Sequence, residues 1–117
     1  VLGPGSLYTS VLAAVAVPAV AEAVRSAPGH LVYVCNLRPQ EGETAGYDVA
    51  AHVDALARHG IHPRTVLYDP AEMGEAQVAG GVTARLAAAD TNQHDPHLLE
   101  MAVRRVLKAQ LAAGNEA

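Results

Sequence analysis

A glycine-rich stretch at the start of the chain places flexible backbone next to hydroxyl side chains. Its candidate ligand-binding residues are Gly3, Pro4, Gly5, Ser6, Leu7, Thr9 and Ser10. A strand end, a glycine turn and a helix start form an anion site, because glycine lets the backbone approach the ligand and the first N–H groups of the helix point at it. The hydroxyl groups would add donors. The alternative is a plain turn between a strand and a helix.

A second polar stretch joins a predicted strand to a predicted helix and is unusually long. Such connections take about 2–6 residues, whereas this one runs from Asn36 to Tyr47. In an open α/β sheet it would lie at the carboxyl end of a strand, where ligands bind. Its candidate ligand-binding residues are Asn36, Glu43, Thr44 and Tyr47. The alternative is a mobile surface loop.

The remaining histidine and cysteine residues do not form a recognisable catalytic set. His52, one turn into a predicted helix, either contacts the ligand or has a structural role. Cys35 lies in an apolar run and is predicted to be a buried thiol. The spacing of His94, Asp95 and His97 resembles that of metal ligands, but helix capping explains Asp95 and no second acidic or cysteine cluster supports a metal. We therefore predict no metal site and assign no catalytic residue.

The composition of the chain limits the kinds of partner that it can bind. The 117 residues fit one domain, 1–117, and half of them are apolar, with four Tyr and no Phe or Trp, so the core should be aliphatic. The formal net charge is −4 and the eight cations are scattered, which argues against nucleic acid. The apolar run from Val11 to Ala21 is too short to span a membrane. One cysteine allows no disulfide framework, which suits a cytoplasmic protein.

The order of the predicted elements indicates how these residues are positioned. The first prediction is a helical region over 8–27, which is either kinked at Pro18 or divided there into two abutting helices, with Pro18 in the first turn of the second. The others are a strand over 31–35, a helix over 48–59, strands over 65–68 and 82–86, and a last helix starting at Asp95 and Pro96. Alternation of strands and helices predicts a three-layer α/β/α Rossmann-like fold with a mostly parallel sheet. Arg85 should face solvent or an anionic ligand, because burying it alone would be costly.

Only Val1 and Leu2 precede the glycine loop, and there is no initiator methionine. We therefore expect this chain to be the later part of a larger protein that lacks its N-terminal half here. The apolar first and last helices could form the interface of a homo-oligomer.

Several motifs occur in an order that resembles the CofD-like family. They are Gly3 to Ser10, Val34-Cys35-Asn36-Leu37, Gly42-Glu43-Thr44 with Gly46-Tyr47, His52-Val53 and His94-Asp95-Pro96. This family includes the YvcK-type gluconeogenesis factors and, more distantly, phospho-lactate transferases of deazaflavin coenzyme synthesis. The resemblance covers essentially the whole chain. The sequence departs from the family in lacking the N-terminal glycine-rich nucleotide loop and in having Glu41 where the family has proline.

The resemblance implies a Rossmann-like fold that binds a nucleotide or nucleotide-sugar at the carboxyl edge of its sheet. The Gly3–Ser10 loop would hold phosphate, and the loop from Glu43 to Tyr47 would border the nucleotide or sugar. YvcK-type members resemble UDP-sugar-binding regulators of carbon metabolism, cell-wall synthesis and cell shape. The transferase branch uses a nucleotide-activated donor with Mg²⁺.

Two functions therefore stay open. The first is a UDP-sugar-type binding regulator, which is favoured because the chain shows no nucleophile–base pair at a credible spacing. The second is a phospho-lactate transferase-like enzyme. Both require the two polar loops to meet at one edge of the sheet.

Overall fold

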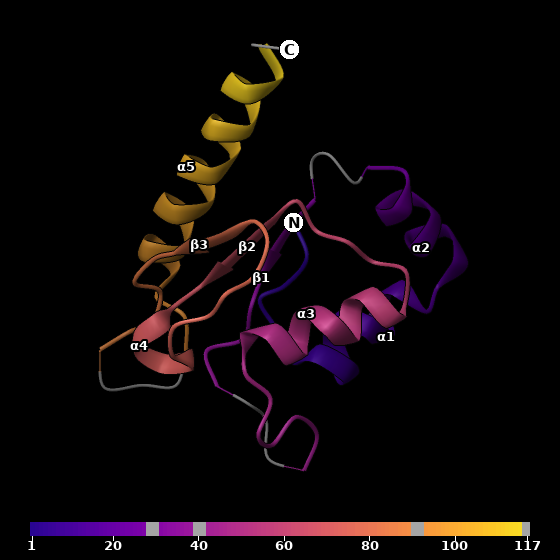
Figure 1. Ribbon diagram of the computed structural model, residues 1–117, viewed down its shortest axis with the longest axis horizontal. Helices are drawn as coiled ribbons and strands as arrows, with labels where there is room; N and C mark the ends of the chain where they lie inside the picture. The colour runs from indigo at the N-terminus through magenta and orange to yellow at the C-terminus, as the bar shows by residue number, and fades with distance from the viewer. Residues whose placement is uncertain (28–30, 39–41, 90–92, 116–117) are drawn as a thin grey trace.

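A parallel sheet forms the centre of the computed structural model, which describes residues 1–27, 31–38, 42–89 and 93–115 (Figure 1). The strands β1 (Val32–Val34), β2 (Thr65–Tyr68) and β3 (Gly81–Thr83) lie in the order β1-β2-β3. Both pairings are parallel, with Val32 opposite Thr65 and Val66 opposite Gly81. The carboxyl ends of all three strands therefore share one edge, as the sequence predicts.

Leu2 extends this sheet beyond β1. It forms a parallel bridge with Tyr33. Its N–H donates to the Val32 carbonyl at 2.7 Å, and its carbonyl accepts from the Val34 N–H at 2.8 Å. The glycine-rich loop that follows Leu2 therefore starts at the same carboxyl edge.

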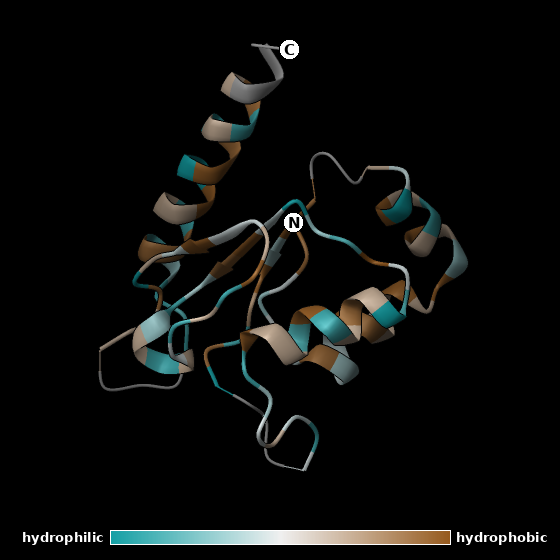
Figure 2. Ribbon diagram, in the orientation of Figure 1, coloured by the Kyte–Doolittle hydropathy of each residue, from teal (hydrophilic) through white to brown (hydrophobic). Residues whose placement is uncertain are grey.

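Helices cover both faces of the sheet, which makes the three predicted layers (Figure 1). On one face, strand residues such as Tyr33, Val66 and Tyr68 share a core cluster with residues of the first helical segment and of α3 (Val49–Arg58). On the other face, Val32, Val34 and Leu67 cluster with α5 (Pro96–Asn115). Neighbouring strand residues point to opposite faces, so strands covered on both faces are hydrophobic along most of their length (Figure 2).

The first helical segment has a break where the sequence predicts one. A π-helical turn, η1 (Leu7–Leu12), continues into α1 (Ala13–Val15), and α2 (Pro18–Arg25) begins at Pro18. The two pieces meet at an angle of 87°. Within the described residues no single helix is long and apolar enough to cross a membrane, although this bent pair reaches the required length and hydropathy together.

The helix starts follow the capping signals of the sequence. Asp48 accepts from the Ala51 N–H at 2.8 Å at the start of α3. Asp95 accepts from the His97 and Leu98 N–H groups at 2.8 and 3.2 Å at the start of α5. Short side chains that accept from first-turn N–H groups stabilise such ends by about 1 kcal/mol each.

The last predicted strand is shorter than expected. It ends at Thr83 instead of Leu86, and the final ladder bond runs from the Ala84 N–H to the Tyr68 carbonyl at 3.0 Å. Beyond that point the Leu86 and Ala87 N–H groups donate to the side chain of Asp69, which precedes the short helix α4 (Pro70–Met73). A side chain therefore takes the place of the neighbouring strand.

Candidate functional site

The two polar loops meet at the carboxyl edge of the sheet, and Glu43 joins them. One oxygen of its carboxylate, Oε1, accepts from the Tyr8 N–H at 2.7 Å and from the Thr9 N–H at 3.1 Å. The other oxygen, Oε2, accepts from the Thr9 hydroxyl at 3.3 Å. Residues separated by 35 positions in sequence are thus held in one place, which is the arrangement that both predicted functions require.

The local backbone explains why this loop needs glycine. Gly3 has φ +80°, and a Cβ atom there would lie 2.6 Å from the carbonyl oxygen of Val34. Any other residue would therefore combine an unfavourable backbone conformation with a collision against the strand. Gly5 is close to Ser10, with a built Cβ at 3.1 Å from the Ser10 Cβ. The glycines let the loop fold tightly over the end of β1 and direct η1 across the sheet.

The anion predicted at the start of this helix is, in this structure, the carboxylate of Glu43. It occupies the Tyr8 and Thr9 N–H groups that were expected to face a phosphate. The hydroxyls nearby form a small cluster, in which Ser6 Oγ contacts Thr9 Oγ1 and lies 3.2 Å from Ser10 Oγ. Thr9 and Ser10 are exposed. These hydroxyls are therefore donors that can face a ligand, whereas the Tyr8 and Thr9 amides are already occupied.

An aromatic pair forms one side of the site. The hydroxyls of Tyr8 and Tyr47 are 3.1 Å apart, and their rings meet edge to face with centroids 6.3 Å apart. The hydrogen bond with Tyr47, and then burial, raise the pKa of Tyr8 above its ordinary value. The Tyr8 phenol therefore stays neutral near pH 7 and acts as a hydrogen-bonding group.

His52 contacts this pair through the Tyr47 ring. Its ring packs edge-on against Tyr47 with centroids 5.8 Å apart, and its Nδ1 lies 2.8 Å from the Asp48 carbonyl oxygen. The side chain is fully buried, and Nε2 has no partner among the described residues. The geometry gives His52 a positioning role for Tyr47.

The other predicted site residues fall into three groups. Leu7 and Thr44 are each 1% exposed, so they are part of the packed interior. Asn36 follows β1 and is partly exposed, and Pro4 is exposed on the glycine loop. Gln40 and Glu41 of the predicted loop lie outside the described residues.

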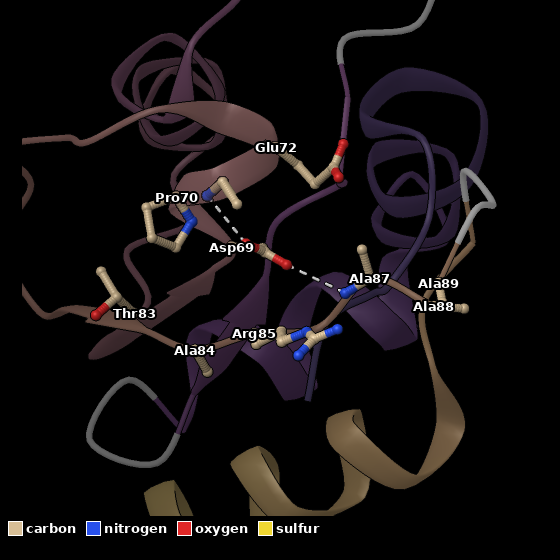
Figure 3. A pocket seen from close by; sticks show the side chains of 10 residues that line it. Asp69, Pro70, Glu72, Thr83, Ala84, Arg85, Ala87, Ala88 and Ala89 are labelled. Carbon is tan, nitrogen blue, oxygen red and sulfur yellow. Dashed lines mark hydrogen bonds between the residues drawn. The ribbon is translucent and has the colours of Figure 1, made fainter.

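A cleft also opens at the carboxyl ends of β2 and β3, away from the residues predicted to bind a ligand. Its volume is about 600 Å³. Asp69, 3% exposed, accepts from the N–H groups of Ala71, Leu86 and Ala87 at 2.9 to 3.1 Å and so joins α4 to the opposite wall (Figure 3). The sequence signal at this position is an acidic residue between the predicted strand 65–68 and a proline.

In two ionisable groups near this edge, burial favours the uncharged form of the side chain. Burial raises the pKa of the Cys35 thiol to about 12, so the thiolate nucleophile is absent at neutral pH. Burial lowers the pKa of His94, while a hydrogen bond to the Cys35 backbone and the charge of Asp69 partly offset that effect. In the described ranges, no group of three or more His, Cys, Asp or Glu side chains could hold a metal ion.

Comparison with known proteins agrees with the motifs. The family model described as 2-phospho-L-lactate transferase CofD matches residues 1–112. A putative gluconeogenesis factor of Deinococcus radiodurans is 36% identical over 128 aligned positions, covering 91% of this chain and 27% of that protein. The gluconeogenesis factor of Bacillus subtilis is 51% identical over 59 residues, covering 50% of this chain and 19% of that protein. The chain thus spans 27% or less of the length of these relatives. No solved structure matches it.

Proposed function

Because this chain belongs to the CofD family, we propose that it binds a nucleotide-sugar of the UDP-sugar type at the joined Gly3–Ser10 and Glu43–Tyr47 loops, and that it acts as a regulator of carbon metabolism and cell-wall synthesis. The observation that carries the proposal is the position of Glu43. It holds the two loops together and keeps a carboxylate oxygen at the surface of the site.

The two oxygens of Glu43 have different partners, and this difference suits a sugar. Oε1 is occupied by two backbone N–H groups, whereas Oε2 accepts only the Thr9 hydroxyl, at 3.3 Å, among the described residues. A carboxylate oxygen can accept more than one donor. Oε2 is therefore available to a ribose or hexose hydroxyl, or to the N–H of a base.

The hydroxyl cluster supplies the complementary donors. Ser6, Thr9 and Ser10 lie within contact of one another and can turn their O–H groups toward phosphate oxygens. The Tyr8 and Tyr47 rings offer an apolar surface beside them. A molecule that carries hydroxyls, phosphates and a flat base matches these three kinds of surface at once.

The test is calorimetric titration of the full-length protein with UDP-glucose, with GTP and buffer as comparisons. The Glu43→Gln variant keeps an oxygen for the Tyr8 and Thr9 N–H groups but replaces the outer acceptor with a donor. We expect it to weaken UDP-glucose binding about tenfold, the size of one charge-assisted hydrogen bond. Thermal unfolding with and without the nucleotide gives an independent readout.

Glu22→Gln is the matched control, because Glu22 is exposed on α2 and carries the same charge. It should bind UDP-glucose as the wild type does. Unchanged affinity in Glu43→Gln, or no binding of UDP-glucose by the wild type, would overturn the proposal.

A transferase acting on a nucleotide-activated donor is the second candidate, and the description of the matching family model favours it. Within the described residues no group of three or more His, Cys, Asp or Glu side chains comes together, so none is assigned to hold that ion. Formation of a phosphodiester product from a nucleotide donor, dependent on added Mg²⁺, would establish this function. Nucleotide-sugar binding without turnover would support the regulator.

A further inference from the structure

We propose that the cleft between α4 and the segment after β3 is a second, separate binding site, and that it takes the phosphate group of a small phosphorylated molecule on Arg85 and Thr83. Both residues line the cleft. This inference does not depend on the function proposed for the Glu43 site.

The cleft has fixed walls. In Figure 3 the Asp69 carboxylate lies between α4 and the segment that carries Arg85 and Ala87. Its hydrogen bonds to the Ala71 N–H at 3.0 Å and to the Ala87 N–H at 3.1 Å hold the two sides at a set distance. A site whose walls are held before the ligand arrives avoids the entropic cost of ordering them on binding.

Both carboxylates of the cleft are already compensated. Asp69 is buried and accepts three backbone N–H groups in all. Glu72 accepts from the Arg38 Nε at 2.8 Å, with the Glu72 side chain 22% exposed. These acidic groups therefore repel an incoming anion much less than free carboxylates would.

Arg85 is the cation left for a ligand. Its side chain is exposed, as expected from the sequence, and within the described part of the chain it makes no hydrogen bond or ion pair. Thr83 ends β3 and Arg85 follows it by two positions, and the side chains of both residues line the cleft (Figure 3). A guanidinium fork and a hydroxyl thus face the same cleft.

The donor set selects phosphate over carboxylate. The guanidinium fork uses two oxygens of an anion, so a carboxylate would have to share one of them with the Thr83 hydroxyl. A phosphate has a third oxygen for it. Ala84, Ala87, Ala88 and Ala89 line the rest of the cleft and leave room for the apolar part of a small ester. At about 600 Å³ the cleft falls within the usual range for small-molecule sites.

The experiment is a calorimetric titration of the full-length protein with inorganic pyrophosphate at constant ionic strength, which measures the affinity. Arg85→Gln should weaken pyrophosphate binding at least about tenfold, and Thr83→Val about threefold. Arg104→Gln is the control, since Arg104 is an exposed cation on α5 that pairs with Glu100 at 3.1 Å. It should leave the affinity within about twofold. Acetate, titrated at the same ionic strength, should bind more weakly than pyrophosphate, and equal binding would contradict the preference for phosphate.

The same variants separate this cleft from the Glu43 site. Arg85→Gln should leave UDP-glucose binding unchanged, whatever affinity the wild type has for it. Equal loss of UDP-glucose and pyrophosphate binding would contradict a separate cleft, because both would then occupy one site. Absence of pyrophosphate binding by the wild type, or full binding by Arg85→Gln, would also overturn the proposal.

Discussion

Two carboxylates serve the same carboxyl edge in different ways. Asp69 and Glu43 each accept backbone N–H groups from a segment distant in sequence. Asp69 is 3% exposed and takes three N–H groups, so every part of it is used inside the protein. Glu43 is partly exposed and takes two, and one of its oxygens borders the surface. Burial, rather than residue type, separates a structural acid from one that can also serve a ligand.

Substitution of Asp69 should cause the largest loss of stability among these predictions. Asp69→Ala leaves three N–H groups without their acceptor, one of them buried and two partly buried, and we expect a loss of about 3 kcal/mol in the free energy of unfolding. Asp69→Asn keeps one oxygen acceptor and should cost roughly half as much. Urea unfolding followed by circular dichroism measures both. A loss in Asp69→Ala below about 1 kcal/mol would show that this carboxylate does not hold the cleft together.

Glu43→Ala should cost less stability than Asp69→Ala. It removes the acceptor for two N–H groups at the exposed start of η1, where water can replace it. We expect the free energy of unfolding to fall by about 1 kcal/mol, which is the usual effect of losing a helix cap. The same urea series provides the value. If Glu43→Ala costs as much as Asp69→Ala, then the two acids have equivalent structural roles and burial does not distinguish them.

The smallest effect concerns pH and His94, which lies beside Asp69. Burial lowers the pKa of His94, so the folded chain binds this proton less tightly than the unfolded chain, whose histidine pKa is about 6.5. The stability from neutral His94 is therefore complete above about pH 6.5 and is lost as the pH falls through the lowered pKa.

Urea unfolding at pH 7.5, 6.5 and 5.5 tests this direction. His94→Gln should lose less stability than the wild type over that range, because it has no proton to gain at this position. An identical pH dependence in both proteins would mean that another group controls acid sensitivity.

Local signals predicted most of the fold. Apolar runs identified β1 and β2, Pro18 marked the break before α2, the helix predicted over 48–59 corresponds to α3, and Asp95 was correctly predicted to cap α5. Each signal acts within a few residues, so the sequence carries it directly. Parallel strands then force the glycine loop and the loop after β1 to one edge, which is why their meeting could also be predicted.

The partners of Glu43 and Asp69 could not be predicted. Glu43 contacts amides 34 and 35 positions away, and Asp69 contacts amides 17 and 18 positions away. No local pattern specifies such pairs, because they depend on how loops pack after the sheet has formed. The same reason explains the shortened last strand and the cleft around Arg85, which exist only once Asp69 has drawn residues 86 and 87 toward α4.

The hydrogen bonds from the start of η1 to Glu43 also protect two amide protons whose exchange reports on this loop. The amide protons of Tyr8 and Thr9 are sheltered by a loop that must close from far along the chain. Their exchange with deuterated solvent therefore records how often that loop opens, independently of global unfolding. A ligand that binds the closed loop would slow the exchange of both protons together, so exchange at these two residues would measure its occupancy.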